Sequence, residues 1–373
     1  MKIAFVFDAV YPHIKGGVEK RIWELSTRLA KRGHDVHIYG MKYWDGKDVV
    51  VRDGVTLHGV CRPVGLYNSS GRRSIRQVLR YTFNLPSALF RERFDLVDCQ
   101  ASPYFPALVC RIYCTLKGIP LVITWHEVWG SYWTEYLGVM GVFARMIEVV
   151  CAHLAGRNFA VSESTRRDLR GIGGKNVAVV PNGVDSPTFE IIPPSNKKSD
   201  MIFIGRLIRD KNVDLLLDAV ARLGKVKVLV VGDGPERKAL EEKAKSLGIE
   251  DKVEFTGFLP SYDQIAALLK SSKVFVFPST REGFGIVAVE AMRCGLPVVT
   301  VRHERNAAAD LVDDGVNGFV VPLDASDLAK AAGRILSDSG LRDRMGEAAR
   351  KKAGEFDWDT IAETLEKRYL GLL

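Results

Sequence analysis

The chain has 373 residues, of which 47% are hydrophobic and 26% are charged. This balance excludes disordered, collagen-like and disulfide-scaffold proteins, and the length predicts two globular domains. The formal net charge of +8 allows a polyanionic partner, either nucleic acid or a membrane surface.

The first half of the chain alternates short apolar runs with helical patterns. Such alternation predicts a mainly parallel sheet with helices on both faces. The predicted strands are residues 2–7, 36–39, 55–60, 96–99, 121–124 and 177–180. Because the first residues form a strand pattern with an acid at Asp8, we expect no signal peptide there.

Two glycines, Gly16 and Gly17, lie between the first predicted strand and a helix over residues 18–32. Glycines at such a turn let backbone N–H groups approach an anionic ligand. The segment does not have the GxGxxG spacing of a dinucleotide-binding turn. Two interpretations therefore remain, a ligand-binding turn and ordinary chain punctuation.

The positive charge is concentrated in the first half of the chain. Residues 1–185 contain 25 Lys and Arg against 16 Asp and Glu, whereas residues 186–373 contain 28 against 29. A cluster with helical spacing consists of Arg72, Arg73, Arg76 and Arg80. Apolar residues predicted to fall on another face of the same helix are Ile75, Val78, Leu79 and Phe83.

This basic amphipathic helix is expected to end at Leu85-Pro86. The pattern is typical of helices that lie at a membrane interface, so we expect a membrane or acceptor contact at the four arginines. The plain alternative is a solvated arginine face over a stripe that packs on the core.

His126 follows the predicted strand at 121–124, where doubly wound folds place functional groups. A lone histidine is more often structural, so both interpretations stay open.

The segment 137–155 is largely apolar but contains Arg145, Glu148 and His153. These polar residues predict a buried amphipathic helix and no membrane span. The six cysteines show no metal-ligand spacing, and we expect free thiols in a cytosolic protein.

The second half repeats the alternation after a Pro-, Ser- and Lys-rich segment at 186–199, which we expect to be a mobile linker. Its predicted strands are residues 201–204, 226–231, 253–255, 274–277, 297–301 and 319–321. Its predicted helices are residues 213–222, 236–247, 262–270, 285–293, 326–337, 341–353 and 358–370. In two doubly wound domains, ligands are expected beyond the carboxyl ends of the strands.

Two cations, Arg206 and Lys211, lie at the first strand-to-helix turn of this half. A planar guanidinium and a compact ammonium beside a helix N-terminus could hold a diphosphate. Solvated basic residues beside a turn are the alternative. The following Gly232-Asp233-Gly234-Pro235 turn is too common in α/β proteins to carry a function alone.

The strongest segment runs from a strand end at Pro278 through a glycine-containing turn into a helix. Its two acids, Glu282 and Glu290, could accept hydrogen bonds from a sugar and from a ribose. Glu290 lies in an apolar run, where a charged side chain is costly unless it has a partner. A loop acid and a helix-face acid without function are the alternative.

Together these motifs resemble those of the family-four retaining glycosyltransferases. Eight of them occur in the family's order over nearly the whole chain, at residues 16–19, 124–127, 161–163, 181–185, 205–211, 232–235, 255–258 and 282–290. The resemblance implies a GT-B fold, that is, an α/β protein with two Rossmann-like, doubly wound parallel-sheet domains facing across a cleft. We expect an N-terminal acceptor domain at 1–185, a linker at 186–199, a donor domain at 200–355 and a last helix at 356–373 that returns to the first domain.

The resemblance also implies roles for single residues. Arg206 and Lys211 would hold the diphosphate, assisted by the backbone amides of Phe284, Gly285, Ile286 and Val287. Glu290 would bind the ribose and Phe258 would lie near the base. Glu282 and His126 would contact the transferred sugar, while Gly16 and Gly17 would lie next to the phosphates.

The expected reaction is hexosyl transfer with retention from a UDP- or GDP-type sugar, with no cofactor and no metal, because cations of the chain stabilise the leaving diphosphate. The expected acceptor is a hydroxyl of a lipid-linked or membrane-proximal glycan. We expect a cytoplasmic protein with the option of peripheral binding at the inner membrane face, and no nucleic-acid partner. The alternatives are a nucleotide-sugar 2-epimerase on the same scaffold and a basic nucleic-acid-binding protein.

One segment departs from the family pattern. Family members often carry a Gly-Gly-x-x-Glu turn where this chain has residues 302–310, RHERNAAAD. This departure bears on local contacts to the donor or the acceptor and leaves the predicted fold unchanged.

Overall fold

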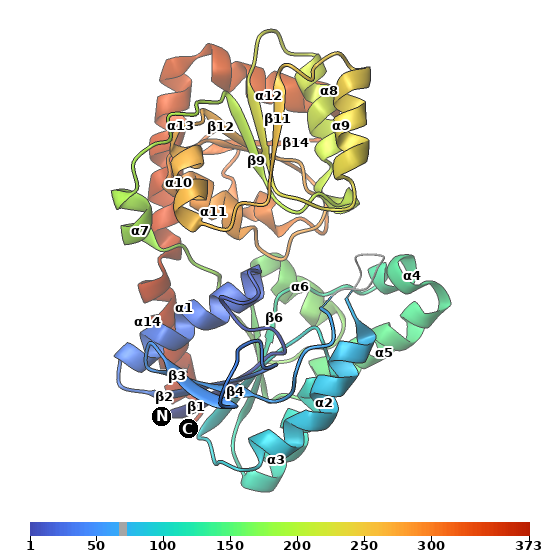
Figure 1. Cartoon of the computed structure of the whole chain (residues 1–373), viewed down its shortest axis with the longest axis vertical. Coiled ribbons are helices and arrows are strands. Elements are labelled where there is room, and N and C mark those ends of the chain that lie inside the picture. Colours follow the sequence, from blue (N-terminus) through green and yellow to red (C-terminus); the bar gives the residue numbers. More distant parts are fainter. Residues whose placement is uncertain (67–72) are drawn as a thin grey trace. The chain divides into compact units, whose positions relative to one another are not determined.

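The computed structural model describes residues 1–66 and 73–373. Contacts within the chain divide it into two compact units, shown in Figure 1. Unit 1 comprises Met1–Asn182 and Trp358–Leu373, and unit 2 comprises Gly183–Asp357. The chain therefore leaves unit 1 after Asn182 and returns to it at Trp358.

Unit 1 is an α/β unit built on an eight-stranded sheet, as far as the described residues go, with the order β3-β4-β2-β1-β5-β6-β7-β8. Its strands are β1 (Lys2–Val6), β2 (Asp35–Gly40), β3 (Val49–Arg52), β4 (Val55–Gly59), β5 (Leu96–Gln100), β6 (Leu121–Trp125), β7 (Arg157–Ala160) and β8 (Val177–Val179). Its helices are α1 (Gly17–Lys31), α2 (Ile75–Leu89), α3 (Phe105–Lys117), α4 (Tyr132–Leu137), α5 (Gly141–Ala152), α6 (Glu163–Gly171) and α14 (Trp358–Leu370). The pairing is parallel except between β3 and β4.

Both faces of this sheet are buried, and the alternation of side chains along each strand separates two apolar clusters. In β1, Ala4 and Val6 belong to one cluster, whereas Ile3 and Phe5 belong to the other. The second cluster includes Trp358 and Leu365 of α14, which runs beside α1 (Figure 1). The last helix is thus part of the core of unit 1.

Unit 2 has a six-stranded sheet within its described residues, in the order β11-β10-β9-β12-β13-β14, and these strands pair in parallel. Its strands are β9 (Met201–Ile204), β10 (Val228–Val231), β11 (Val253–Gly257), β12 (Val274–Phe277), β13 (Val298–Val301) and β14 (Gly318–Val321). Its helices are α7 (Ser186–Ile191), α8 (Val213–Ala221), α9 (Arg237–Ser246), α10 (Tyr262–Lys270), α11 (Ile286–Arg293), α12 (Ala325–Ser337) and α13 (Ser339–Ala353).

The strand order of unit 2 is that of a Rossmann fold, with the direction of winding reversed between β9 and β12. Two helices of this unit, α12 and α13, begin at side-chain caps that the sequence provides. The Asp324 carboxylate accepts from the Ser326 and Asp327 amides at the start of α12, and the Asp338 carboxylate accepts from the Leu341 amide at the start of α13. The predicted α/β class with two parallel sheets is confirmed.

The structure differs from the sequence prediction at several elements of unit 1. The prediction omitted β3, which forms a hairpin with β4, and it omitted β7, which lies between α5 and α6. Helix α2 continues through Pro86 to Leu89 instead of breaking there. The apolar segment at 137–155 is also not a buried helix, because α5 exposes Phe143 (58%) and Met146 (60%) to solvent.

The segment 186–199, expected as a mobile linker, is packed on unit 2. It contains α7, and the Lys270 ammonium donates to the backbone carbonyls of Glu190 and Ile192 at 3.0 and 2.5 Å. The Ser195 amide donates to the carbonyl of Ala267 at 3.0 Å. These bonds fix the segment because α10 supplies partners for its backbone.

Candidate functional site

The candidate phosphate-binding residues of unit 2 follow β9 at the point where the strand order reverses. Arg206 is exposed, and Lys211 ends a 3-10 turn (Arg209–Lys211) that precedes α8. The loop after β10 comes so close that a Cβ on Gly232 would lie 1.9 Å from the Gly205 carbonyl oxygen. Gly232 also has a φ of +134°, so glycine is required there on both grounds.

Lys211 and Glu282 form an ion pair across this switch point. Glu282 lies in the loop after β12, and the Lys211 ammonium also lies 5.3 Å from the centre of the Phe277 ring. The two side chains are only 15% and 14% exposed, so the pair is partly shielded from water. The structure thus brings together the residues that the sequence assigns to the diphosphate and to the sugar.

Residues 302–310, where the chain departs from the family pattern, hold Glu282 in place. The Glu282 amide donates to the Arg305 carbonyl at 2.8 Å, and the Ala307 amide donates to the Glu282 carbonyl at 2.9 Å. The Asn306 side chain anchors the segment by donating to the Val301 carbonyl at 2.8 Å. The atypical residues therefore position the candidate sugar-binding acid through backbone hydrogen bonds.

Helix α11 begins directly after this loop. Gly285 is its N-cap with a φ of +96°, and an added Cβ would lie 2.7 Å from Ala308 Cβ. Phe284 is buried against Phe356, so only its backbone could meet a ligand. The amides of Ile286 and Val287 lie in the first turn, where N–H groups lack intrahelical partners and favour an anion.

Two further donor-site candidates differ in exposure. Phe258, directly after β11, is 60% exposed and lies at the same carboxyl edge of the sheet as Arg206. Glu290 is only 2% exposed within α11. A stacking contact of Phe258 and a ribose contact of Glu290 both remain predictions.

In unit 1, Gly16 and Gly17 begin α1 after β1. The Glu19 carboxylate folds back and accepts from the Gly16 amide, and a Cβ on Gly16 would lie 2.3 Å from Glu19 Oε2. Burial raises the pKa of Glu19 to about 7, although these backbone bonds oppose the rise. In this structure, Gly16 makes room for a helix cap, and its phosphate contact remains a prediction.

His126 follows β6 and belongs to a polar network at the carboxyl ends of β5 and β6. Its Nε2 lies 2.9 Å from Gln100 Oε1. Burial, with a smaller effect of Arg21, lowers the pKa of His126 to about 3. His126 is therefore neutral at physiological pH.

Two family models match the chain. One, described as "Glycosyltransferase Family 4", matches residues 15–186, and the other, "Glycosyl transferases group 1", matches residues 186–352. The chain belongs to the family-four glycosyltransferases. It is a retaining enzyme that uses a nucleotide sugar, as the sequence motifs indicated.

Curated members of the family are similar over nearly the full length. An uncharacterised glycosyltransferase of Methanocaldococcus jannaschii is 26% identical over 97% of this chain and 96% of that protein. The gpi3 subunit of the phosphatidylinositol N-acetylglucosaminyltransferase of Schizosaccharomyces pombe is 25% identical over 98% and 79%. Glycogen synthase of Mycobacterium tuberculosis is 25% identical over 99% and 94%.

Solved structures of the same fold include two that cover the whole chain. Sucrose-phosphate synthase from Thermosynechococcus elongatus superimposes with a TM-score of 0.84 at 21% identity, covering 100% of this chain and 98% of that one. HepE of Anabaena, in complex with UDP and glucose, gives 0.79 at 24% identity, covering 100% of both chains. The fold is therefore GT-B, as predicted.

The sequence motifs of this glycosyltransferase do not include four residues of the polar network, Arg21, Asp98, Gln100 and Tyr369. All four are buried and belong to the network around His126. The signal for Asp98 and Gln100 was present, because both are polar residues at the end of a buried strand. No signal connected Tyr369, because α14 reaches this network only in the folded unit.

The arginine cluster is not one helix face. Arg73 precedes α2 and pairs with the buried carboxylate of Asp8, whereas Arg72 lies outside the described residues. Arg76 and Arg80 are exposed on α2. The apolar face was also predicted wrongly in part, since Val78 is buried but Ile75, Leu79 and Phe83 are 61%, 37% and 79% exposed beside the arginines.

A cluster in unit 1 has donor atoms of the buried His37 and His58 and of the partly exposed Glu92 within 4.8 Å of one another. Lys2 Nζ lies 2.5 Å from Glu92 Oε2, so the chain already supplies a cation to this carboxylate. His37 Nδ1 and His58 Nε2 lie 2.8 Å apart, and burial lowers the pKa of His58 to about 4. These contacts account for the cluster as a buried hydrogen-bond network.

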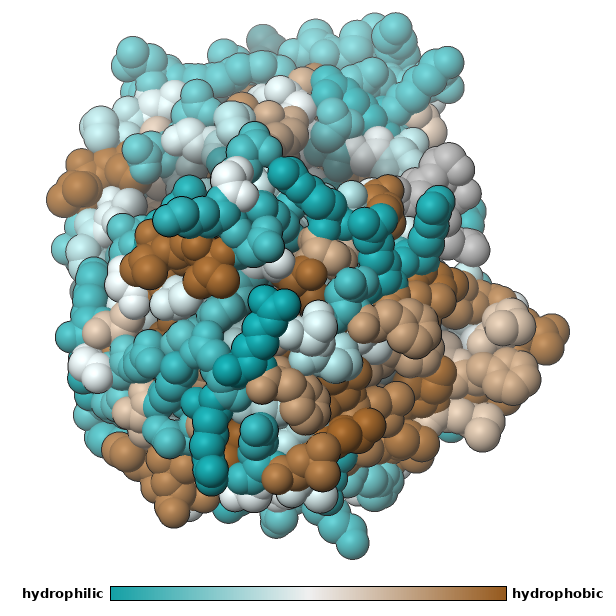
Figure 2. All heavy atoms as spheres, turned by 60° about the horizontal axis from the view of Figure 1, so that its bottom comes forward, coloured by the Kyte–Doolittle hydropathy of each residue, from teal (hydrophilic) through white to brown (hydrophobic). Residues whose placement is uncertain are grey.

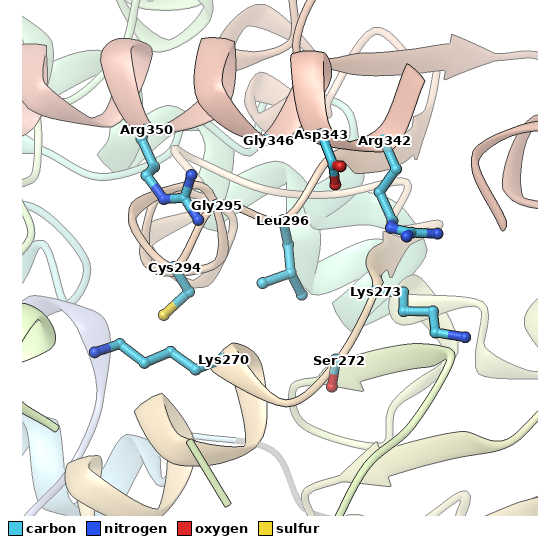
Figure 3. Close-up of a pocket in the computed structure, with 10 residues that line it drawn as sticks. All are labelled: Lys270, Ser272, Lys273, Cys294, Gly295, Leu296, Arg342, Asp343, Gly346 and Arg350. Atoms are coloured by element: carbon cyan, nitrogen blue, oxygen red, sulfur yellow. The ribbon is translucent and has the colours of Figure 1, made fainter. Parts of the chain in front are cut away.

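One pocket of unit 2, with a volume of about 280 Å³, is not part of the candidate donor site (Figure 3). Its lining includes Lys273, which directly precedes β12, and Leu296, which lies two residues before β13. The pocket therefore lies at the amino edge of the parallel sheet, opposite to Arg206 and Glu282.

Proposed function

We propose that this protein transfers a hexose from a UDP- or GDP-type sugar to a hydroxyl of a lipid-linked or membrane-proximal glycan. The donor part of the proposal is supported by two cations, Arg206 and Lys211, at the switch point of the sheet in unit 2. HepE, a neighbour in fold, binds UDP and glucose. Cleavage of the sugar–phosphate bond places negative charge on the leaving diphosphate, which these cations would stabilise without a metal.

The retaining reaction needs little else from the chain. The acceptor hydroxyl attacks the anomeric carbon on the face from which the phosphate leaves, and a leaving-phosphate oxygen takes the hydroxyl proton. Glu282 and His126 would bind hydroxyls of the transferred sugar. Glu282 forms an ion pair with Lys211, so the acid proposed to bind the sugar lies beside a cation proposed to bind the diphosphate.

Substitution of the two cations tests the donor part. We expect Arg206→Ala and Lys211→Ala each to lower kcat/KM by about 100-fold, because a charged contact to the developing diphosphate is lost. The measurement is donor hydrolysis or sugar transfer. Arg209→Ala is the matched control, since this exposed arginine lies in the same turn, and it should keep wild-type activity. Near wild-type turnover in both cation variants would contradict the assignment.

The acceptor part rests on the exposed face of unit 1. Helix α2 presents Ile75, Leu79 and Phe83 together with Arg76 and Arg80. Apolar side chains also protrude at the start of α5 and just before it, where Val139 is 84%, Met140 is 63% and Phe143 is 58% exposed. Figure 2 shows hydrophobic side chains gathered over the lower right part of this unit.

Exposed aromatic and aliphatic side chains beside arginines fit the interfacial region of an anionic bilayer. Each basic residue near such a surface contributes about 1 kcal/mol, and the apolar side chains add the burial of their area. Among the described residues, no helix combines the length and hydropathy needed to cross a bilayer. The S. pombe relative is named for phosphatidylinositol, whereas the M. tuberculosis relative is a glycogen synthase, so acceptors differ within the family.

Vesicle flotation tests the acceptor part. We expect the protein to float with anionic vesicles at low salt, and Arg76→Ala/Arg80→Ala to weaken binding about 30-fold. Phe83→Ser and Phe143→Ser should weaken it through loss of buried apolar area. Lys238→Ala/Lys330→Ala removes two exposed lysines of unit 2 and is the matched control. A protein that stays in the bottom fraction with anionic vesicles at low salt would refute the membrane contact.

A further inference from the structure

His126 ends a chain of hydrogen bonds that runs to the last helix of unit 1. Gln100 Oε1 lies 2.9 Å from His126 Nε2, and Gln100 Nε2 donates to Asp98 Oδ1 at 2.8 Å. Asp98 Oδ2 accepts from the Tyr369 hydroxyl at 2.5 Å. Strand β5 supplies Asp98 and Gln100, whereas α14 supplies Tyr369, so the chain of bonds exists only when α14 is docked.

The direction of every bond in this chain follows from Asp98. An ionised carboxylate only accepts hydrogen bonds, and Thr124 Oγ1 lies 2.8 Å from the same oxygen that Gln100 contacts. Burial raises the pKa of Tyr369 far above its ordinary value, so the phenol stays protonated and donates. Burial also raises the pKa of Asp98 to about 6, while the bonds from Tyr369 and Thr124 and the charge of Arg21 oppose this rise, so Asp98 is ionised at neutral pH.

The orientation of the Gln100 amide then fixes the proton on His126. Because the amide NH₂ faces the Asp98 carboxylate, the carbonyl oxygen faces the imidazole. A carbonyl oxygen can only accept, so Nε2 must carry the hydrogen of the neutral ring. Nδ1 is left as an acceptor, and within residues 1–66 and 73–373 it makes no hydrogen bond.

We propose that Asp98, Gln100 and Tyr369 are positioning residues that hold His126 as the Nε2–H tautomer, so that Nδ1 accepts a hydrogen bond from a hydroxyl of the transferred sugar. This inference rests on the proposed function, in which His126 contacts that sugar. It gives this hydrogen bond a direction, because the sugar hydroxyl must donate and the imidazole Nδ1 must accept. A sugar derivative that presents only an acceptor at this position, such as a methyl ether, is therefore disfavoured.

The tautomer can be read by long-range ¹⁵N–¹H NMR of the histidine rings, with His126→Gln to assign the signal. The wild-type protein should show the Nε2–H tautomer at neutral pH. Asp98→Asn presents an amide that no longer dictates the orientation of Gln100, so both tautomers should appear. Tyr369→Phe removes one donor to Asp98 and keeps the ring, which makes it the variant least expected to unfold.

Kinetics provide the second readout. We expect Asp98→Asn and Tyr369→Phe to lower kcat about 10-fold with a smaller change in the KM for the donor, because a misoriented ring weakens a contact to the reacting sugar. Tyr113→Phe is the matched control, because this buried phenol donates to the Glu92 carbonyl at 2.8 Å, away from His126. It should keep both the tautomer and kcat.

A wild-type His126 that is protonated or Nδ1–H at neutral pH would overturn the proposal. So would folded Asp98→Asn and Tyr369→Phe variants with the wild-type tautomer and wild-type kcat. Failure of the proposed function looks different, because Arg206→Ala and Lys211→Ala would then leave turnover unchanged. The tautomer measurement does not depend on turnover and would still decide whether the three residues position His126.

Discussion

Single residues in unit 1 combine burial with charge. Asp8, Glu19 and Asp98 are all buried acids, and burial raises the pKa of each. Each has a compensating partner, namely Arg73 for Asp8, the Gly16 amide for Glu19 and Tyr369 for Asp98. Such groups keep polar atoms inside an apolar core at a cost in stability that depends on pH.

Glu19 predicts a pH-dependent stability. Its pKa rises from an ordinary 4.5 to about 7 in the folded state, so the folded protein holds a proton that the unfolded chain releases. The free energy of unfolding should therefore fall as pH rises through this window, by about 1.4 kcal/mol per pH unit at most and about 3 kcal/mol in total. Glu19→Gln should remove the part of this fall that Glu19 causes, which urea unfolding at several pH values can measure.

Glu24→Gln serves as the control, because it changes an acid on the same helix and leaves Glu19 in place. The free energy of unfolding of Glu24→Gln should still fall between the ordinary pKa of Glu19, 4.5, and its folded-state pKa of about 7. If Glu19→Gln and the wild-type protein lose stability in parallel as the pH rises, then Glu19 does not titrate in this window.

Among the elements, α14 is separated from the other helices of its own unit by the whole of unit 2. It follows unit 2 directly but belongs to unit 1, where Trp358, Ile361 and Leu365 lie in the same core cluster as residues of α1. Ion pairs add to this contact, since Arg28 Nε lies 2.7 Å from Asp359 Oδ1. The helix thus completes one face of the first sheet.

We therefore expect Leu365→Ala to destabilise unit 1 selectively. Leu365 is 1% exposed, and truncation of a buried leucine costs about 2–5 kcal/mol. In a urea titration that resolves the two units, only the transition of unit 1 should move to lower urea. Leu370→Ala, on the same helix but 54% exposed, should leave both transitions in place. Equal shifts in the two variants would show that α14 is not a core helix.

At the scale of the whole molecule, the net charge of +8 is distributed unequally. The excess lies in the first half of the chain. The described arginines of the predicted basic helix have two different roles in the structure. Arg73 neutralises a buried acid, whereas Arg76 and Arg80 face solvent beside exposed apolar residues. The proposed membrane contact therefore depends on fewer charges and more apolar area than the sequence indicated.

The sequence by itself determined the α/β class, the second sheet and the family. In unit 2, the strands at 201–204 and 274–277 and the helix at 262–270 coincide with the predicted ranges. Prediction succeeds there because buried parallel strands are short apolar runs, and glycine turns and caps mark their ends. The family motifs lie on those turns, so the candidate donor residues could also be named from the sequence.

Only the tertiary structure decided which residues meet. The Lys211–Glu282 pair, the support of Glu282 by residues 302–310 and the bond between Tyr369 and Asp98 join segments distant in the chain. The sequence also could not reveal that α2 and α5 expose apolar side chains. Periodicity identifies an apolar stripe on a helix but does not tell whether another element covers it. Burial and long-range hydrogen bonds depend on the packing of the whole unit, and no local pattern encodes them.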